Sequence, residues 1–357
     1  MVHGDIARKL INVANSLVRH FPGGLGCVSV VTSMGMAGVS GSSVADSASV
    51  GSVLIPEMKR KGYSASFAAS INASSSVVGI IIPPSSTMII IAWLANLSVA
   101  EMFLAGIIPG VLIGITYLTV TVIISIRRNY PKEERPTFGE LIKSILSAFW
   151  ALLLPLLLIV VIVLGVATAT EAAAVAAFYA FLIAVVVYKT LSWKGFLKAL
   201  KDSVYSTTVV MMIVCTASIF TWVLIQQRIP QLLSDTMLGF GLPDWALLLL
   251  MIFIMFLFGM VMDLVPNLFI FIPIFLPMAV EIGIDPIHFC LIMLSTLALG
   301  LFTPPVGTTL FVSLHLAKEK MENTLKDLLP YVVSGFAIVL LIAYVPFLTM
   351  WIPGLME

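Results

Sequence analysis

Two matching stretches decide the fold, GIIIPPS at residues 79–85 and GLFTPPVG at residues 300–307. In each stretch, two consecutive prolines interrupt a long apolar run, and a glycine lies four residues before the first proline. Proline removes an amide donor and frees carbonyl groups upstream, so neither run continues as a regular α-helix. Unwound backbone survives at membrane depth only where the protein or a polar cavity satisfies it. One proline would indicate a simple kink, whereas two doublets at corresponding positions indicate duplicated functional breaks.

The composition around these stretches is that of an integral membrane protein. Of the 357 residues, 60% are hydrophobic and only 10% are charged, and the formal net charge is +1. A soluble domain carries about 25% charged residues. These values exclude a soluble enzyme, a disordered chain and a nucleic-acid binder, so nucleic acid is not an expected partner.

The apolar runs divide into three kinds. A helix that crosses the hydrocarbon needs about 20 apolar residues. Uninterrupted runs of that kind predict spanning helices over 103–126, 146–166, 170–188, 203–225 and 331–353. The runs at 63–96 and 286–317 contain the proline doublets and are predicted to be broken transmembrane helices. Gly, Ser, Asp or Pro interrupt the runs at 25–58 and 243–282, which are predicted to be re-entrant hairpins.

The basic residues test this map, because Lys and Arg concentrate in cytoplasmic loops. With a cytoplasmic start, all of the 19 Lys and Arg residues except Arg228 fall in loops on the inner side. If either hairpin were a full crossing, the later loops would change sides and the charges would scatter.

The same order of elements occurs twice, with opposite orientation in the membrane. A hairpin, a broken helix and a full span occur in both halves, so the fold class is an all-α membrane protein with an inverted-topology repeat. The domains are an interfacial helix 1–22, a first repeat 23–126, a cytoplasmic linker 127–145, scaffold helices 146–225 and a second repeat 230–353. Because three spans precede the second hairpin and none precedes the first, we expect three further N-terminal helices in a complete two-repeat protein.

Free carbonyls and hydroxyls at the breaks and hairpin tips would form an oxygen cage suited to a small hard cation such as Na⁺. Half-helix N-termini nearby would favour an anionic substrate group. Two acids, Asp46 and Asp263, lie deep in apolar segments at matching places in the hairpins. Each is a candidate for ion or proton handling, or alternatively caps the second arm of its hairpin. Further candidates at the tips or facing the substrate are Asn72, Ser74, Ser85 and Asn267.

One rival motif is Gly38-Val39-Ser40-Gly41, which resembles the GxSG motif of rhomboid intramembrane proteases. A serine nucleophile there would need a histidine base on a neighbouring helix. His288 and His315 lie only near the ends of a predicted span. A protease also gives no reason for duplicated proline doublets.

Taken together, several motifs resemble the large membrane subunit of tripartite ATP-independent periplasmic (TRAP) transporters of the C4-dicarboxylate and sialic-acid type. They are PGGL at 22–25, SGSSVAD at 40–46, KGY at 61–63, AGIIPG at 105–110, GIDP at 283–286 with His288-Phe289, and the two proline stretches. The resemblance covers essentially the whole chain. The chain departs from the family at the N-terminus, where members begin with further helices.

The resemblance implies a multi-pass transporter of the bacterial inner membrane, not an enzyme, with an elevator mechanism like that of the ion transporter superfamily. It would be a Na⁺-driven symporter that imports a dicarboxylate, a sugar acid or a sialic acid, with Na⁺ as coupling ion and no other cofactor or metal. The implied partners are a periplasmic solute-binding protein, a small membrane subunit and the lipid bilayer. A stand-alone carrier of related build is the alternative.

The family also implies two sodium sites, largely formed by backbone carbonyls. Carried over by position, the first involves Ser40, Ser42 or Ser43 with Gly79, Ile82 and Pro84. The second involves Gly259, Gly300, Thr303 and Val306. The polar residues between the two hairpin tips would then line the substrate pocket.

Overall fold

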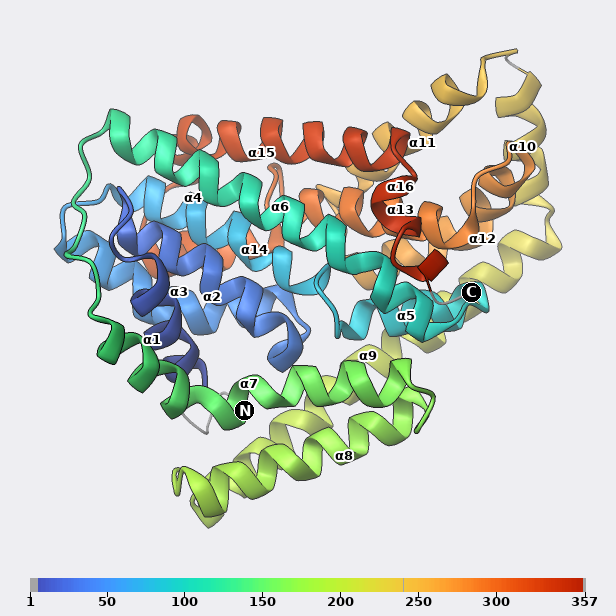
Figure 1. The fold of residues 1–357 in the computed structure, drawn as a ribbon. Helices are drawn as coiled ribbons and strands as arrows, with labels where there is room; N and C mark the ends of the chain where they lie inside the picture. The colour runs from blue at the N-terminus through green and yellow to red at the C-terminus, as the bar shows by residue number, and fades with distance from the viewer. Residues whose placement is uncertain (1–5, 240, 356–357) are drawn as a thin grey trace.

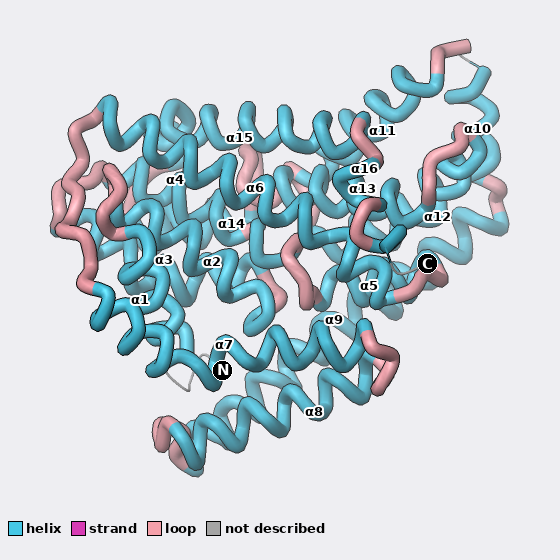
Figure 2. Tube along the Cα trace, viewed as in Figure 1, coloured by secondary structure: helices cyan, strands magenta, loops and turns pink. Residues whose placement is uncertain are grey.

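The computed structural model describes residues 6–239 and 241–355, and within these ranges every regular element is a helix and there is no strand. The long helices lie side by side along a common direction (Figure 1). Figure 2 shows loop segments within the bundle as well as at its ends. In chain order the helices are α1 (Ile6–Val18), α2 (Gly24–Ser40), α3 (Ser43–Arg60), α4 (Ala65–Ser76), η2 (Val78–Ile80), α5 (Ser86–Ala95), α6 (Val99–Arg127), α7 (Phe138–Val163), α8 (Ala169–Leu182), the π-helix η3 (Ile183–Val187), α9 (Trp193–Gln226), α10 (Ile229–Gly239), α11 (Asp244–Gly259), α12 (Leu264–Glu281), α13 (Pro286–Gly300), α14 (Thr308–Ala317), α15 (Met321–Tyr344), α16 (Phe347–Met350) and η4 (Pro353–Leu355).

Six helices within the described residues are long and apolar enough to cross a membrane, namely α6, α7, α8 with η3, α9, α12 and α15. Five of them correspond to the predicted uninterrupted spans. The sixth, α12, is the second arm of a predicted hairpin. Its 18 residues, which include Pro273 and Pro277, would extend about 27 Å as a regular helix. Length alone therefore does not distinguish this arm from a full span.

Three boundaries differ from the predicted ones. The last long helix covers 321–344 instead of 331–353. It begins earlier because the acidic Asp327 near its start is paired with Arg128. It ends earlier because Pro346 follows shortly after its last residue. Helix α7 begins at Phe138 inside the predicted linker 127–145. Helix α9 is continuous from Trp193 to Gln226, whereas the predicted spanning helix covers only 203–225. Within the segment 1–22 that is predicted as an interfacial helix, α1 covers Ile6–Val18. Residues 1–5 lie outside the described part of the chain.

The two helical hairpins open toward opposite ends of the bundle. At the open end of α2–α3, the Lys59 ammonium donates to the carbonyl of Ala317, where α14 ends and α15 is about to begin. At the open end of α11–α12, the Tyr344 hydroxyl at the far end of α15 donates to the carbonyl of Trp245 at 2.7 Å. The 24 residues of α15 separate these ends by about 36 Å. The hairpins therefore point at one another from opposite sides.

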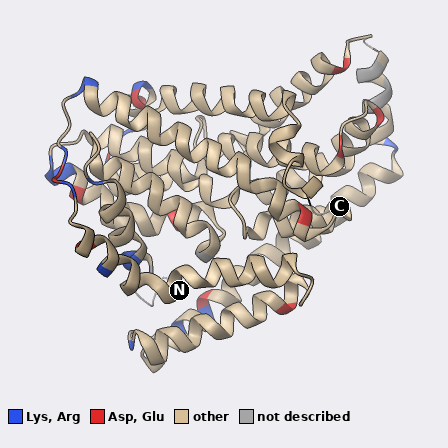
Figure 3. Cartoon of the chain, viewed as in Figure 1, with Lys and Arg blue, Asp and Glu red and all other residues tan. Residues whose placement is uncertain are grey.

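Basic residues gather at one end of the bundle (Figure 3). This is the end where α6 stops and α15 starts, since Arg128 pairs with Asp327 there. The hydrogen bond to that carboxylate raises the pKa of Arg128 above its ordinary value, so the guanidinium stays charged. This end corresponds to the predicted cytoplasmic side.

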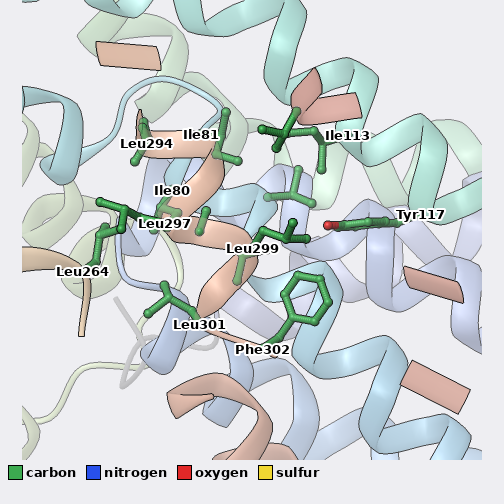
Figure 4. Close-up of a cluster of buried hydrophobic side chains, with 14 of the residues drawn as sticks. Ile80, Ile81, Ile113, Tyr117, Leu264, Leu294, Leu297, Leu299, Leu301 and Phe302 are labelled. Carbon is green, nitrogen blue, oxygen red and sulfur yellow. The ribbon is translucent and has the colours of Figure 1, made fainter. Parts of the chain in front are cut away.

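The two breaks share one apolar cluster. Ile80 and Ile81 from the first break pack near Leu301 and Phe302 from the second, with Tyr117 of α6 beside them (Figure 4). The Tyr117 and Phe302 rings meet edge to face, with centroids 5.9 Å apart. Because lipid tails are as apolar as these side chains, close packing and not water exclusion holds such a cluster together.

Candidate functional site

The first break lies between α4 and α5, where residues 77–85 leave the α-helical pattern through the short turn η2. The Pro83–Pro84 peptide bond is cis. Ser85 closes the break, because its hydroxyl donates to the carbonyl of Ile80 at 2.7 Å and caps α5 by accepting from Met88 N. Ser85 is buried. The predicted candidate Ser85 thus shapes the break directly.

The tip of the first hairpin meets this break. Gly41 has a φ of +60° in the turn between α2 and α3, a conformation that favours glycine. Its carbonyl accepts a hydrogen bond of 2.8 Å from the hydroxyl of Ser86 at the start of α5. Ser42 caps α3 by accepting from Ala45 N. The tip is therefore attached to the second half of the broken helix.

Asp46 connects the hairpin to the break from inside. Its carboxylate is fully buried, and Oδ1 accepts a 2.5 Å hydrogen bond from the Ser40 hydroxyl. Oδ2 has no hydrogen-bond partner within the described residues. A methyl group at Gly79 would lie 2.5 Å from this oxygen, so a glycine is needed for the close approach. The N-cap of α3 is Ser42 and not Asp46, and the hydrogen bond from Ser40 at the end of α2 to Asp46 links the two arms of the hairpin at its tip.

The second break, between α13 and α14, also packs against a hairpin tip. The amides of Val306 and Gly307 both donate to the carbonyl of Met260, at 3.1 and 3.4 Å. A methyl group at Gly300 would lie 2.6 Å from the carbonyl oxygen of Gly259. The Thr303 hydroxyl donates to Leu299 O at 2.7 Å. The structure thus brings together all four residues of the second predicted sodium site.

The two hairpin acids differ in environment. Asp263 is exposed at the N-cap of α12 and makes no capping hydrogen bond with its side chain. Asn267 is buried and donates to Met262 O and Asp263 O, while its Oδ1 lacks a partner within the described residues. Corresponding positions in the sequence therefore have different roles in the two halves.

A buried polar cluster joins the two halves of the chain. The amide of Asn72 donates to the hydroxyls of Ser47 and Ser313 at 3.0 and 2.8 Å. The Thr309 hydroxyl, at the start of α14, donates to Ala73 O at 3.3 Å. Asn72 therefore connects α4 to α3 and α14. The Ser74 hydroxyl donates to Ser70 O and Ile71 O in its own helix. Sequence reasoning did not identify Ser47, Thr309 or Ser313, although Thr309 and Ser313 share one face of α14 at a spacing of four.

The residues of the first site do not all lie in one cavity. Ser40, Gly41, Pro84, Ser85 and Ser86 line a cavity of about 150 Å³ whose opposite wall comes from α7 and α8. Ile82 instead lines an apolar groove of about 520 Å³ beside α1, α2 and α6. Ser43 is buried at the start of α3.

Carbonyl and hydroxyl oxygens dominate both breaks. No group of three or more His, Cys, Asp or Glu side chains within the described residues could hold a metal ion. Unwound backbone with carbonyls and half-helix ends is the arrangement by which transporters coordinate Na⁺. The donor set therefore fits an alkali cation better than a transition metal.

Comparison with known proteins gives a family match over nearly the whole chain. Residues 1–348 match the family model of the tripartite ATP-independent periplasmic transporter, DctM component. The chain is 35% identical to the 2,3-diketo-L-gulonate TRAP transporter large permease protein YiaN of Escherichia coli, over 96% of the chain and 81% of the relative. It is 36% identical to the C4-dicarboxylate large permease protein DctM of Pseudomonas aeruginosa, over 99% and 83%. It is 34% identical to the sialic acid large permease protein SiaM of Vibrio cholerae, over 99% and 83%.

Proposed function

The chain belongs to the DctM component family of tripartite ATP-independent periplasmic transporters, and from this premise we propose that it is the permease subunit of a Na⁺-coupled importer of an organic anion. The family and the six long apolar helices make it a multi-pass membrane protein and a transporter component, not an enzyme. The observation that carries the proposal is the pair of proline breaks, each packed against a hairpin tip that arrives from the opposite end of the bundle.

The intramembrane protease is therefore excluded, and the site geometry agrees. The Ser40 hydroxyl donates to Asp46. The ring nitrogens of His288 are hydrogen-bonded to Thr349 Oγ1 and Ala343 O. His288 is thus engaged in joining the start of α13 to the end of α15.

We assign sodium coupling to the two breaks. At the first, the Ser40 hydroxyl and Gly79 lie against the carboxyl group of Asp46, and its oxygen without a partner among the described residues faces the unwound backbone. The Ser40 hydroxyl also lies 3.3 Å from the carbonyl oxygen of Ser42. At the second, the contact between Gly259 and Gly300 and the hydroxyl of Thr303 favour a site made mainly of carbonyl oxygens.

The substrate class follows from the relatives. Those with similar sequences are named for diketogulonate, C4-dicarboxylates and sialic acid, which are all organic anions. The cavity at Ser40, Gly41, Ser85 and Ser86 offers uncharged polar groups and the N-terminus of α5, where an anionic group is favoured.

An elevator motion explains why the chain has two kinds of helix. The first hairpin and both broken helices share the buried cluster of Ser47, Asn72 and Ser313, which favours movement of these elements as one block. Helices α7 and α8 have a small apolar cluster of their own, and no described side chain of α9 is buried. We propose that α7–α9 form the scaffold, that the hairpins are re-entrant, and that the complex lies in the bacterial inner membrane with a periplasmic binding protein and a small membrane subunit.

The test is uptake into proteoliposomes that contain this chain and its small subunit, measured with and without a sodium gradient and with and without the binding protein. We expect uptake of an organic anion only when sodium and the binding protein are both present. Uptake without the binding protein would support the stand-alone carrier instead, and uptake without sodium would refute the coupling.

A further inference from the structure

A polar cleft runs between α1 and the first turns of α7, away from both breaks. Its volume is about 360 Å³. Its walls are Asn12, Asn15, Ser16 and Arg19 from α1, and Glu140, Lys143, Ser144 and Ser147 from α7. Every side chain in this lining is polar or charged, which is unusual in a chain with so few charged residues.

Hydrogen bonds between the two helices hold the cleft together. The hydroxyls of Ser16 and Ser144 lie 2.7 Å apart, and Arg19 forms an ion pair of 2.6 Å with Glu140. Lys9 donates to Ser147 O and lies 4.2 Å from the ring centroid of Tyr188. The cleft therefore has a fixed shape.

The charge in the cleft is positive. Arg19 and Lys143 line the cleft together with a single acid, Glu140. Arg19 is committed to Glu140 and to Glu134 O. By contrast, the ammonium group of Lys143 and the side-chain amides of Asn12 and Asn15 have no hydrogen-bond partner among the described residues. These groups are donors available to an anion.

The outer surfaces of both helices favour a location at the membrane interface. On α7, Phe138, Leu146 and Phe149 are exposed on the face opposite the cleft. On α1, Leu10 and Val13 are buried toward the rest of the bundle. A helix with one polar and one apolar face lies at the boundary between headgroups and acyl chains. The cleft also lies at the basic end of the molecule, which is the predicted cytoplasmic side, and the anionic lipids of a cytoplasmic leaflet attract basic residues.

We propose that this cleft is a binding site for the phosphate headgroup of an anionic phospholipid. Lys143 and the two asparagine amides bind the phosphate, and the acyl chains lie along the exposed apolar face of α7. Because Arg19 O also accepts from Glu133 N at 3.2 Å, a lipid bound in the cleft would steady the junction between the end of α1 and the loop before α7.

The test measures binding of phosphatidylglycerol and of phosphatidylcholine with identical acyl chains to the detergent-solubilised full chain, by native mass spectrometry. We expect saturable binding of phosphatidylglycerol in preference to phosphatidylcholine. Lys143→Gln should weaken it about fivefold, the effect of one basic residue near an anionic surface. Asn15→Leu should weaken it without changing any charge. Lys194→Gln, an exposed lysine near the start of α9, is the matched control and should bind as the parent does.

Three results would overturn the proposal. They are equal binding of the two lipids, parental binding by Lys143→Gln, and complete displacement of phosphatidylglycerol by an equal concentration of inorganic phosphate. The last result would show a site for free anions. Equal melting temperatures of the variants and the parent establish that a loss of binding is not a loss of folding.

Discussion

The contact between Gly300 and Gly259 allows a sharp test of the second sodium site. In Gly300→Ala, the added methyl group would lie 2.6 Å from the Gly259 carbonyl oxygen and 2.7 Å from its Cα. These are backbone atoms, so no side-chain rotation relieves the overlap. The hairpin tip or the break must move instead. Overpacking of this kind costs about 1–3 kcal/mol.

If that strain falls on the ion-bound arrangement, the affinity for sodium drops by a corresponding factor. With tenfold for each 1.4 kcal/mol, the expected loss is about 5- to 150-fold. The assay is the sodium concentration that gives half-maximal uptake in proteoliposomes, with the melting temperature measured in parallel with and without sodium. We expect a higher half-maximal concentration and a smaller stabilisation by sodium in the variant.

Gly35→Ala is the matched control. Gly35 lies within α2, and a methyl group there meets no atom within 4 Å. Alanine also favours a helix over glycine by about 1 kcal/mol, so this variant should keep the parental sodium affinity and melt no lower. A Gly300→Ala protein that melts at a lower temperature but keeps the parental sodium dependence would refute the reasoning, because the strain would then not reach the ion.

Three other substitutions extend the test. Thr303→Val keeps the shape of the side chain but removes a buried hydroxyl, so it should raise the half-maximal sodium concentration while destabilising the fold by only about 1 kcal/mol. Unchanged sodium affinity would show that carbonyls alone bind the ion. Asp46→Asn should reduce sodium-driven uptake far more than Asp263→Asn, because Asp46 is fully buried beside the first break while Asp263 is exposed. Equal losses of uptake in the two variants would contradict this difference. Asp327→Asn weakens the pairing with Arg128, so it should destabilise the protein by about 1.5–3 kcal/mol, which is the contribution of a hydrogen bond to a charged group. If the variant unfolds at the same temperature as the parent, the pair is dispensable for stability.

Much of the candidate site could be predicted from local sequence. The proline doublets forbid continuous helices wherever they occur, so the breaks at 77–85 and 301–307 needed no tertiary information. Gly79 and Gly300 are predicted as sodium-site residues from the family resemblance, and the structure places them against Asp46 and Gly259.

Other features could not be predicted in this way. An uninterrupted apolar run ends at a charged residue, so the sequence predicts a start at residue 331, ten residues after α15 begins. Only the partner on another helix shows that Asp327 is tolerated there. Likewise, Ser47 and Ser313 are ordinary helical serines in the sequence, and their contact depends on how α3 and α14 pack.

The sequence by itself determined the membrane class, the order of the elements and the positions of the breaks, because these depend on hydrophobicity and on the backbone chemistry of proline and glycine. Only the tertiary structure decided which polar groups meet. It buried Asp46 and left Asp263 exposed at the matching place, and it formed the cleft between α1 and α7. The physical reason is that burial and pairing depend on neighbours that are distant in the chain, whereas helix breaking and hydrophobicity are local.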